Sequence, residues 1–165
     1  MQFRFIVKIF FFFSLITIST ADIIKPTNTK LNHLKEYIGT YEDAKIYTDK
    51  FVSKKLNKLL GNELEHLKRN LSVRGPINFI DGEVVITGNA PHLGTIEDAI
   101  LSINLYNGKI SAAIHSNETI TVYTEENNYQ YLPISIKDYL AVWKTNMKFR
   151  FEPPEKLKIV QPVNK

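Results

Sequence analysis

The hydrophobic pattern of this chain changes its period once, at Gly75-Pro76. Before this point, apolar residues between residues 40 and 60 recur every three or four positions, which predicts an amphipathic helix with a lysine-rich outer face. Gly61 is expected to end this helix, and a second short helix is predicted to run to about Leu71. After this point apolar and polar residues alternate, which is typical of β-strands.

The second part of the chain predicts five strands that follow one another through short connections. We expect them at residues 77–80, 83–87, 97–106, 109–116 and 119–124. Asp81-Gly82 and Asn107-Gly108 are two-residue hairpin turns between neighbouring strands. Because strands joined locally pair antiparallel, the pattern predicts an antiparallel sheet.

A further helix is expected after the strands. It would begin at Ser135, because Ser135 with Asp138 forms a variant of the capping box. Its apolar positions are Ile136, Tyr139, Leu140 and Trp143. Helices at both ends and a sheet in the middle define an α+β fold in which the helices cover the apolar face of the sheet.

The N-terminus has the pattern of a secretory signal peptide. Arg4 and Lys8 precede the apolar run Ile9–Ile18, and Ser19 and Ala21 place small residues at positions −3 and −1 of a cleavage site. The apolar run has about half of the ~20 residues that a membrane-spanning helix needs. We therefore expect cleavage after Ala21 and a periplasmic or secreted protein without a membrane span. An uncleaved N-terminal anchor is the alternative.

These patterns divide the chain into three parts. Residues 1–21 are the signal peptide, 22–150 form a single α+β domain, and 151–165 form an extended C-terminal tail. The chain contains no cysteine, so disulfides, thiolate metal sites and a cysteine nucleophile are excluded.

Charge is unevenly distributed along the chain. Residues 22–74 carry 11 basic and 7 acidic side chains, 75–136 carry 1 basic and 7 acidic, and 137–165 carry 7 basic and 3 acidic. No arginine stripe or alternation of aromatic and basic residues is present, so we expect no nucleic-acid partner. The acidic middle would steer the protein toward a basic partner, and acids on solvated strand faces are the alternative interpretation.

No motif of catalysis or metal binding is present. The sequence lacks a glycine-rich phosphate loop, the metalloprotease and serine-hydrolase motifs, and histidines or carboxylates at metal-ligand spacing. We interpret His66 as a solvated surface residue and His115 as a residue at the sheet edge. Nothing in the sequence around His33 indicates a role for it. No catalytic residue, cofactor or metal is predicted, although folding could still bring distant residues together.

His92 has a different setting from the other histidines. It follows Pro91 in a loop between two predicted strands, and Gly88 and Gly94 flank the pair. Proline fixes its own φ, and the glycines permit a tight, protruding turn. Such a preordered loop suits insertion into a cleft of another protein. The alternative is a plain strand connection whose histidine caps a backbone group.

The segment Val84–Ala113, VVITGNAPHLGTIEDAILSINLYNGKISAA, resembles the core of the inhibitor of vertebrate lysozyme family. Members of that family are exported bacterial proteins with a helix-flanked antiparallel sheet and a protruding loop that reads Cys-Lys-Pro-His-Asp-Cys. Here Asn89-Ala90-Pro91-His92-Leu93-Gly94 occupies that stretch. The resemblance implies that His92 enters the lysozyme cleft and meets the catalytic carboxylates, with Pro91 as its rigid support.

Three positions of the loop depart from the family pattern. Asn89 and Gly94 stand where the family has cysteines, and Leu93 stands where it has an acid. The loop therefore lacks the family's disulfide and is expected to be softer, which raises the cost of ordering it on binding. Leu93 cannot form the hydrogen bonds of a carboxylate.

The sequence and the resemblance together predict an exported lysozyme inhibitor, not an enzyme. The partner would be a protein, and the resemblance implies a basic lysozyme; a homodimer is also compatible with the sequence. The partner-binding residues would be Asn89, Ala90, Pro91, His92, Leu93 and Gly94. The alternatives are an exported binding module that shares only the fold, and a small hydrolase with His92 as general base. A His92 on a convex loop favours the inhibitor, whereas a His92 in a pocket favours the enzyme.

Overall fold

The computed structural model describes residues 29–94, 96–116, 119–145 and 157–161. The predicted signal peptide and most of the predicted C-terminal tail lie outside these residues. The first described part is helical. It comprises the 3₁₀-helix η1 (Thr29–Tyr37), α1 (Asp43–Thr48), α2 (Lys50–Leu60), the 3₁₀-turn η2 (Gly61–Glu63) and α3 (Leu64–Asn70).

A sheet of seven strands follows within the described residues. Its strands are β1 (Val73–Arg74), β2 (Asn78–Ile80), β3 (Glu83–Asn89), β4 (Glu97–Asn104), β5 (Ile110–Ser116), β6 (Thr119–Thr124) and β7 (Leu157–Val160). The 3₁₀-turn η3 (Tyr129–Tyr131) and helix α4 (Ile134–Thr145) lie between β6 and β7. The strand order is β1-β3-β4-β5-β6-β7, with β2 also paired to β3. All neighbours are antiparallel except β6 and β7, which are parallel.

The predicted α+β class is confirmed, and the predicted number of strands is too low. All five predicted strands are present, but β1 and β7 were not predicted. A two-residue strand such as β1 is too short to show an alternating pattern. β7 lies in the proline-containing tail and pairs with a strand far away in the sequence.

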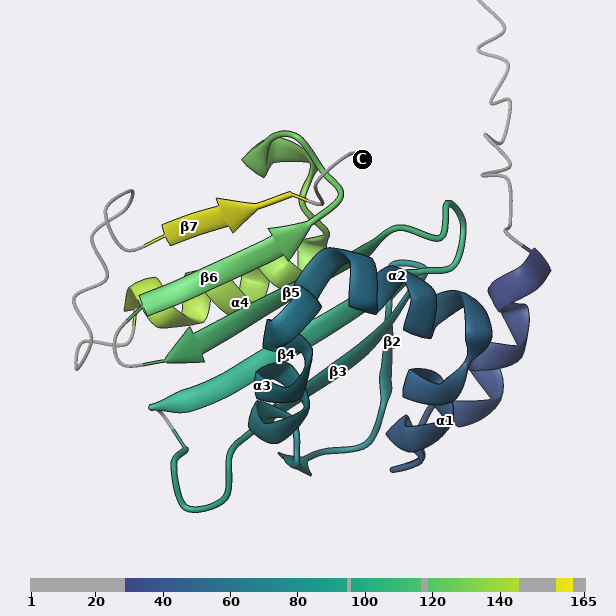
Figure 1. The fold of residues 1–165 in the computed structure, drawn as a ribbon, viewed down its shortest axis with the longest axis horizontal. Coiled ribbons are helices and arrows are strands. Elements are labelled where there is room, and N and C mark those ends of the chain that lie inside the picture. The colour runs from purple at the N-terminus through teal and green to yellow at the C-terminus, as the bar shows by residue number, and fades with distance from the viewer. Residues whose placement is uncertain (1–28, 95, 117–118, 146–156, 162–165) are drawn as a thin grey trace, which may run out of the picture.

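Helices cover both faces of the sheet rather than one, with α2 and α3 on one face and α4 on the other (Figure 1). Alternate strand residues enter two separate apolar cores. Val84 and Leu101 contact the core beneath α2 and α3, whereas Val85 and Ile100 contact the core beneath α4. Seven of the eight residues of β4 are consequently buried. The prediction of a single apolar face is therefore wrong, because β3, β4 and β5 are apolar on both sides.

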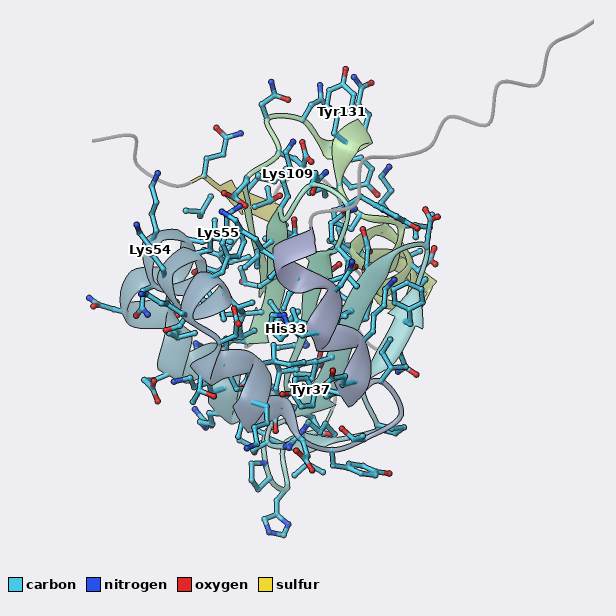
Figure 2. All side chains as sticks on the ribbon, turned by 90° about the vertical axis from the view of Figure 1, so that its right-hand side faces the viewer. His33, Tyr37, Lys54, Lys55, Lys109 and Tyr131 are labelled. Atoms are coloured by element: carbon cyan, nitrogen blue, oxygen red, sulfur yellow. The ribbon has the colours of Figure 1, made fainter. Side chains whose placement is uncertain are left out.

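The helix predicted over residues 40–60 is divided in two at Asp49. This residue has extended backbone (φ −58°, ψ 129°), and its carboxylate Oδ1 accepts hydrogen bonds from the amides of Phe51 (3.0 Å) and Val52 (2.9 Å). It is thus the N-cap of α2, a position that aspartate favours. The second oxygen of Asp49 lies 2.9 Å from Nε2 of His33, which is labelled in Figure 2. The predicted end of the helix at Gly61 is confirmed, with Gly61 at φ 55°.

Ser135 does not cap α4, contrary to the prediction. The helix begins one residue earlier, and the Ser135 hydroxyl donates a hydrogen bond of 2.7 Å to Glu83, which is only 4% exposed. Glu83 also accepts a bond of 2.9 Å from Ser102 on β4. The buried carboxylate needs these donors, and this requirement takes Ser135 away from a capping role.

Candidate functional site

The loop between β3 and β4 projects beyond the end of the sheet (Figure 1). Its tip is a tight turn in which the amide of Leu93 donates to the carbonyl of Ala90 at 3.1 Å. Pro91 occupies the second position of this turn and His92 the third, where the backbone has a φ of 60°. Proline second and a positive φ third are the features of a type II turn. Histidine is one of the few non-glycine residues enriched at positive φ.

Backbone hydrogen bonds close the loop at its base. The amide of Ala90 donates to the carbonyl of Glu97 at 2.9 Å, and the amide of Glu97 donates to the carbonyl of Leu93 at 2.9 Å. The side-chain amide of Asn89 adds a bond of 2.8 Å to the carbonyl of Ala90. The loop is thus closed by hydrogen bonds in a chain that has no cysteine.

The six residues predicted to bind a partner differ in exposure. Pro91, His92 and Gly94 are exposed, Asn89 and Leu93 are half-buried, and Ala90 is fully buried. Ala90 therefore supports the turn from inside. Pro91 and His92 are the exposed side chains at the tip of the turn.

Glu97 lies directly at the base of the loop and faces the core beneath α3. It is 7% exposed, and its oxygens accept hydrogen bonds from His66 Nε2 (3.0 Å), Asn70 Nδ2 (3.0 Å) and Ser116 Oγ (2.7 Å). His66 also contacts Glu63 through Nδ1 at 3.2 Å. Both ring nitrogens of His66 therefore contact carboxylates. The interpretation of His66 as a solvated surface residue is therefore wrong.

Asp98, the next residue, faces the opposite side of the sheet. It accepts a hydrogen bond from the hydroxyl of Tyr139 on α4 and lies 3.0 Å from His115 Nδ1 on β5. His115 is 2% exposed and lies between β4 and β6, in the interior of the sheet. The prediction that His115 is an edge residue is wrong, because its position near a strand end does not reveal which strands flank it.

The polar environment changes the pKa of two buried carboxylates in opposite directions. Burial alone would raise the pKa of Glu97, but hydrogen bonds from His66, Ser116 and Asn70, together with the charge of His66, lower it to about 2. Burial raises the pKa of Glu83, and its hydrogen bonds from Ser135 and Ser102 offset only part of this effect. Glu97 is thus held ionised, whereas Glu83 is biased toward its protonated form.

Most acids of the middle stretch that the structure describes are buried or paired with lysines. Glu83, Glu97 and Asp98 are buried. Lys55, which lies beside Lys109 in Figure 2, pairs with Glu125 at 2.9 Å, and Lys109 pairs with Glu126 at 2.8 Å. This stretch therefore has few exposed and unpaired acids with which to attract a basic partner.

A groove of about 320 Å³ lies between α4 and the sheet. Its lining residues are Asn78, Ile80, Val85, Thr87, Ile100, Ser135, Asp138, Tyr139 and Val142. His92 is not among them. In the described part of the chain, no group of three or more histidine and acidic side chains could hold a metal ion. Nor is any described helix long and apolar enough to cross a membrane.

The polar network at the loop base was not predicted from the sequence. The adjacent pair Glu97-Asp98 at the start of an otherwise apolar strand is a signal for it, because neighbouring strand residues face opposite sides of a sheet. The partners of these acids come from α3, β5 and α4, and no local pattern indicates which residues meet there.

No curated protein and no solved structure matches the chain. Residues 52–146, more than half of the chain, match the family described as inhibitor of vertebrate lysozyme (Ivy). This range includes α3, the loop with His92, strands β1 to β6 and α4. The chain therefore belongs to the Ivy family of lysozyme inhibitors.

Proposed function

We propose that this protein is an exported inhibitor of lysozyme whose loop Ala90–Gly94 plugs the active-site cleft. The observation that carries the proposal is the exposed His92 at the tip of a hydrogen-bonded turn. A preordered tip reduces the entropy that binding must overcome. Membership of a family of inhibitors supports the same function and argues against an enzyme.

The chemistry of a lysozyme cleft explains why histidine suits the tip. Glycoside hydrolases of this kind place two carboxyl groups on either side of the scissile bond. A doubly protonated imidazole has two N–H donors on different sides of one small ring, so it can donate to both carboxylates. A ring held between two carboxylates is present inside this chain, where the nitrogens of His66 lie 3.2 Å from Glu63 and 3.0 Å from Glu97. His92 would form the same bridge between two carboxylates of the partner.

Pro91 and Leu93 would complete the contact. Pro91 restricts the backbone before His92 and is itself exposed, so it would contact the cleft wall. Leu93 is half-buried, and it would contribute apolar area where the loop meets the rim of the cleft. The loop would bind through shape and through one charge-assisted contact.

The test is lysis of bacterial cell walls by lysozyme in the presence of the protein without residues 1–21. We expect stoichiometric inhibition that His92→Asn weakens strongly but leaves measurable at high protein concentration. Asparagine accepts a positive φ as histidine does but lacks the imidazole. Full inhibition by His92→Asn would exclude the proposed role of His92, and no inhibition of any lysozyme by the unaltered protein would exclude the function.

A further inference from the structure

We propose that Glu97 is a positioning residue for His92: its buried carboxylate fixes the base of the loop to α3 and β5, and so sets where the imidazole enters the partner. This inference rests on the proposed function. Glu97 would not itself touch the partner, because its side chain is turned into the core beneath α3.

Two sets of bonds meet at Glu97. Its backbone closes the loop, since its amide donates to Leu93 and its carbonyl accepts from Ala90, both at 2.9 Å. Its side chain is bound by three donors that come from two other elements, α3 and β5. Rotation of the loop about its base would therefore require these side-chain bonds to break.

Asn70 strengthens this connection. It is fully buried at the end of α3, and its side-chain nitrogen donates to Glu97 at 3.0 Å and to the carbonyl of His115 at 3.2 Å. One amide group thus connects the loop base to the interior strand β5. A buried carboxylate with this many donors is costly to move, because any displacement leaves the charge and the donors unpaired.

Asp98 holds the other face of the same strand end. Its partners are His115 on β5 and Tyr139 on α4, so the two acids together fix the start of β4 from both sides of the sheet. The base of the loop is thereby held by α3 on one side and by α4 on the other. A loop without a covalent bridge gains a defined direction from this arrangement.

The decisive experiment is a double-mutant cycle between Glu97 and His92, read as the inhibition constant for lysozyme. Glu97→Ala removes the acceptor, and we expect inhibition to weaken on the order of tenfold when His92 is present. The same substitution in the His92→Asn background should change inhibition less than about twofold, because the ring that Glu97 positions is gone. Equal losses in the two backgrounds would overturn the proposal.

Glu97→Gln is the conservative variant. Its carbonyl can still accept from His66 and Asn70, and its NH₂ can donate to the Ser116 hydroxyl, which is able to accept. We therefore expect Glu97→Gln to restore most of the inhibition that Glu97→Ala loses. If glutamine fails as completely as alanine, the hydrogen-bonding role is wrong.

Hydrogen exchange separates this inference from the proposed function. The amides of Leu93 and Glu97 should exchange about tenfold faster in Glu97→Ala, whereas the amide of Ile103 at the far end of β4 should be unchanged. The matched control is Glu83→Gln, a buried carboxylate about 20 Å away at the other end of β3, which should leave the loop amides unaffected. Unchanged loop exchange in Glu97→Ala overturns the positioning role whether or not lysozyme is inhibited.

Discussion

His92 combines an uncommon backbone conformation with an exposed side chain. Its φ of 60° belongs to the left-handed region, which costs an L-residue about 1–2 kcal/mol relative to glycine. Among the described residues, the imidazole makes no hydrogen bond that could offset this cost. Strain at an exposed tip is typical of a residue kept for binding.

Substitution of His92 by glycine should therefore separate stability from binding. We expect His92→Gly to raise the free energy of unfolding by up to about 1 kcal/mol, because glycine relieves the positive φ. The same change should weaken lysozyme binding by about 2–5 kcal/mol, since it leaves the cleft carboxylates buried without a partner. Urea unfolding and titration calorimetry measure the two quantities. Lower stability together with unchanged binding would identify His92 as a structural residue.

The two buried carboxylates should give opposite pH dependences of stability. The pKa of Glu97 falls from an ordinary 4.5 to about 2 on folding, so its contribution is complete above pH 4.5 and is lost as the pH falls toward 2. The size of this loss is about 3 kcal/mol. The pKa of Glu83 is raised, so its contribution is complete below pH 4.5 and is lost as the pH rises through the folded-state pKa.

Unfolding free energies of the glutamine variants between pH 2 and 7 would check this assignment. Glu97→Gln should reduce the loss of stability as the pH falls below 4.5. Glu83→Gln should reduce the loss of stability as the pH rises above 4.5. The prediction fails if Glu97→Gln leaves the acid slope of the unaltered protein in place.

At the scale of elements, local sequence signals located the strands and turns well. The hairpin at Asp81-Gly82 is confirmed by positive φ at both residues. The predicted two-residue turn at Asn107-Gly108 is wrong in length, because β4 already ends at Asn104 and β5 begins at Ile110. The break at Asp49 could not be predicted in the same way, because the apolar spacing continues through it. The capping bonds and the contact with His33 outweigh that spacing.

Asp49 should consequently stabilise the helical layer. Asp49→Ala removes the cap of α2 and the partner of His33, and we expect a loss of about 1 kcal/mol in the free energy of unfolding. Asp49→Asn keeps a capping oxygen and is expected to lose less than half of this amount. Thermal or urea unfolding of both variants gives the comparison. Equal losses in the free energy of unfolding would show that the capping bonds contribute nothing beyond the contact with His33.

At the scale of the whole molecule, the sequence predicted the fold class, the family and the exposed Pro91-His92 tip. It did not predict β1, β7 or the second apolar core, because these depend on pairings between distant segments. The same limit explains the misinterpretation of His66 and His115, whose buried carboxylate partners, Glu97 and Asp98, lie 31 and 17 residues away in the chain.

Export is a property of the whole chain and can be tested directly. The basic residues Arg4 and Lys8, the apolar run Ile9–Ile18 and the small residues before Asp22 favour cleavage after Ala21. N-terminal sequencing of the protein recovered outside the cytosol should therefore start at Asp22. A full-length product found only in the cytosol would contradict export.

The overall charge of the molecule sets how it should meet a basic lysozyme. Without residues 1–21 the chain carries 19 basic and 17 acidic side chains, and the acids of its middle stretch are mostly buried or paired with lysines. A weakly basic protein has no long-range attraction for a basic partner.

We therefore expect the association rate with a basic lysozyme not to increase as the ionic strength is lowered from 0.15 M to about 0.01 M, where the screening length grows from about 8 Å to about 30 Å. Stopped-flow measurement at several salt concentrations gives the slope. Glu126→Gln, which frees the charge of Lys109, should move the slope further toward repulsion. A rate that rises tenfold at low salt would instead show that the remaining exposed acids steer the encounter, and that burial and pairing have not cancelled the acidic stretch.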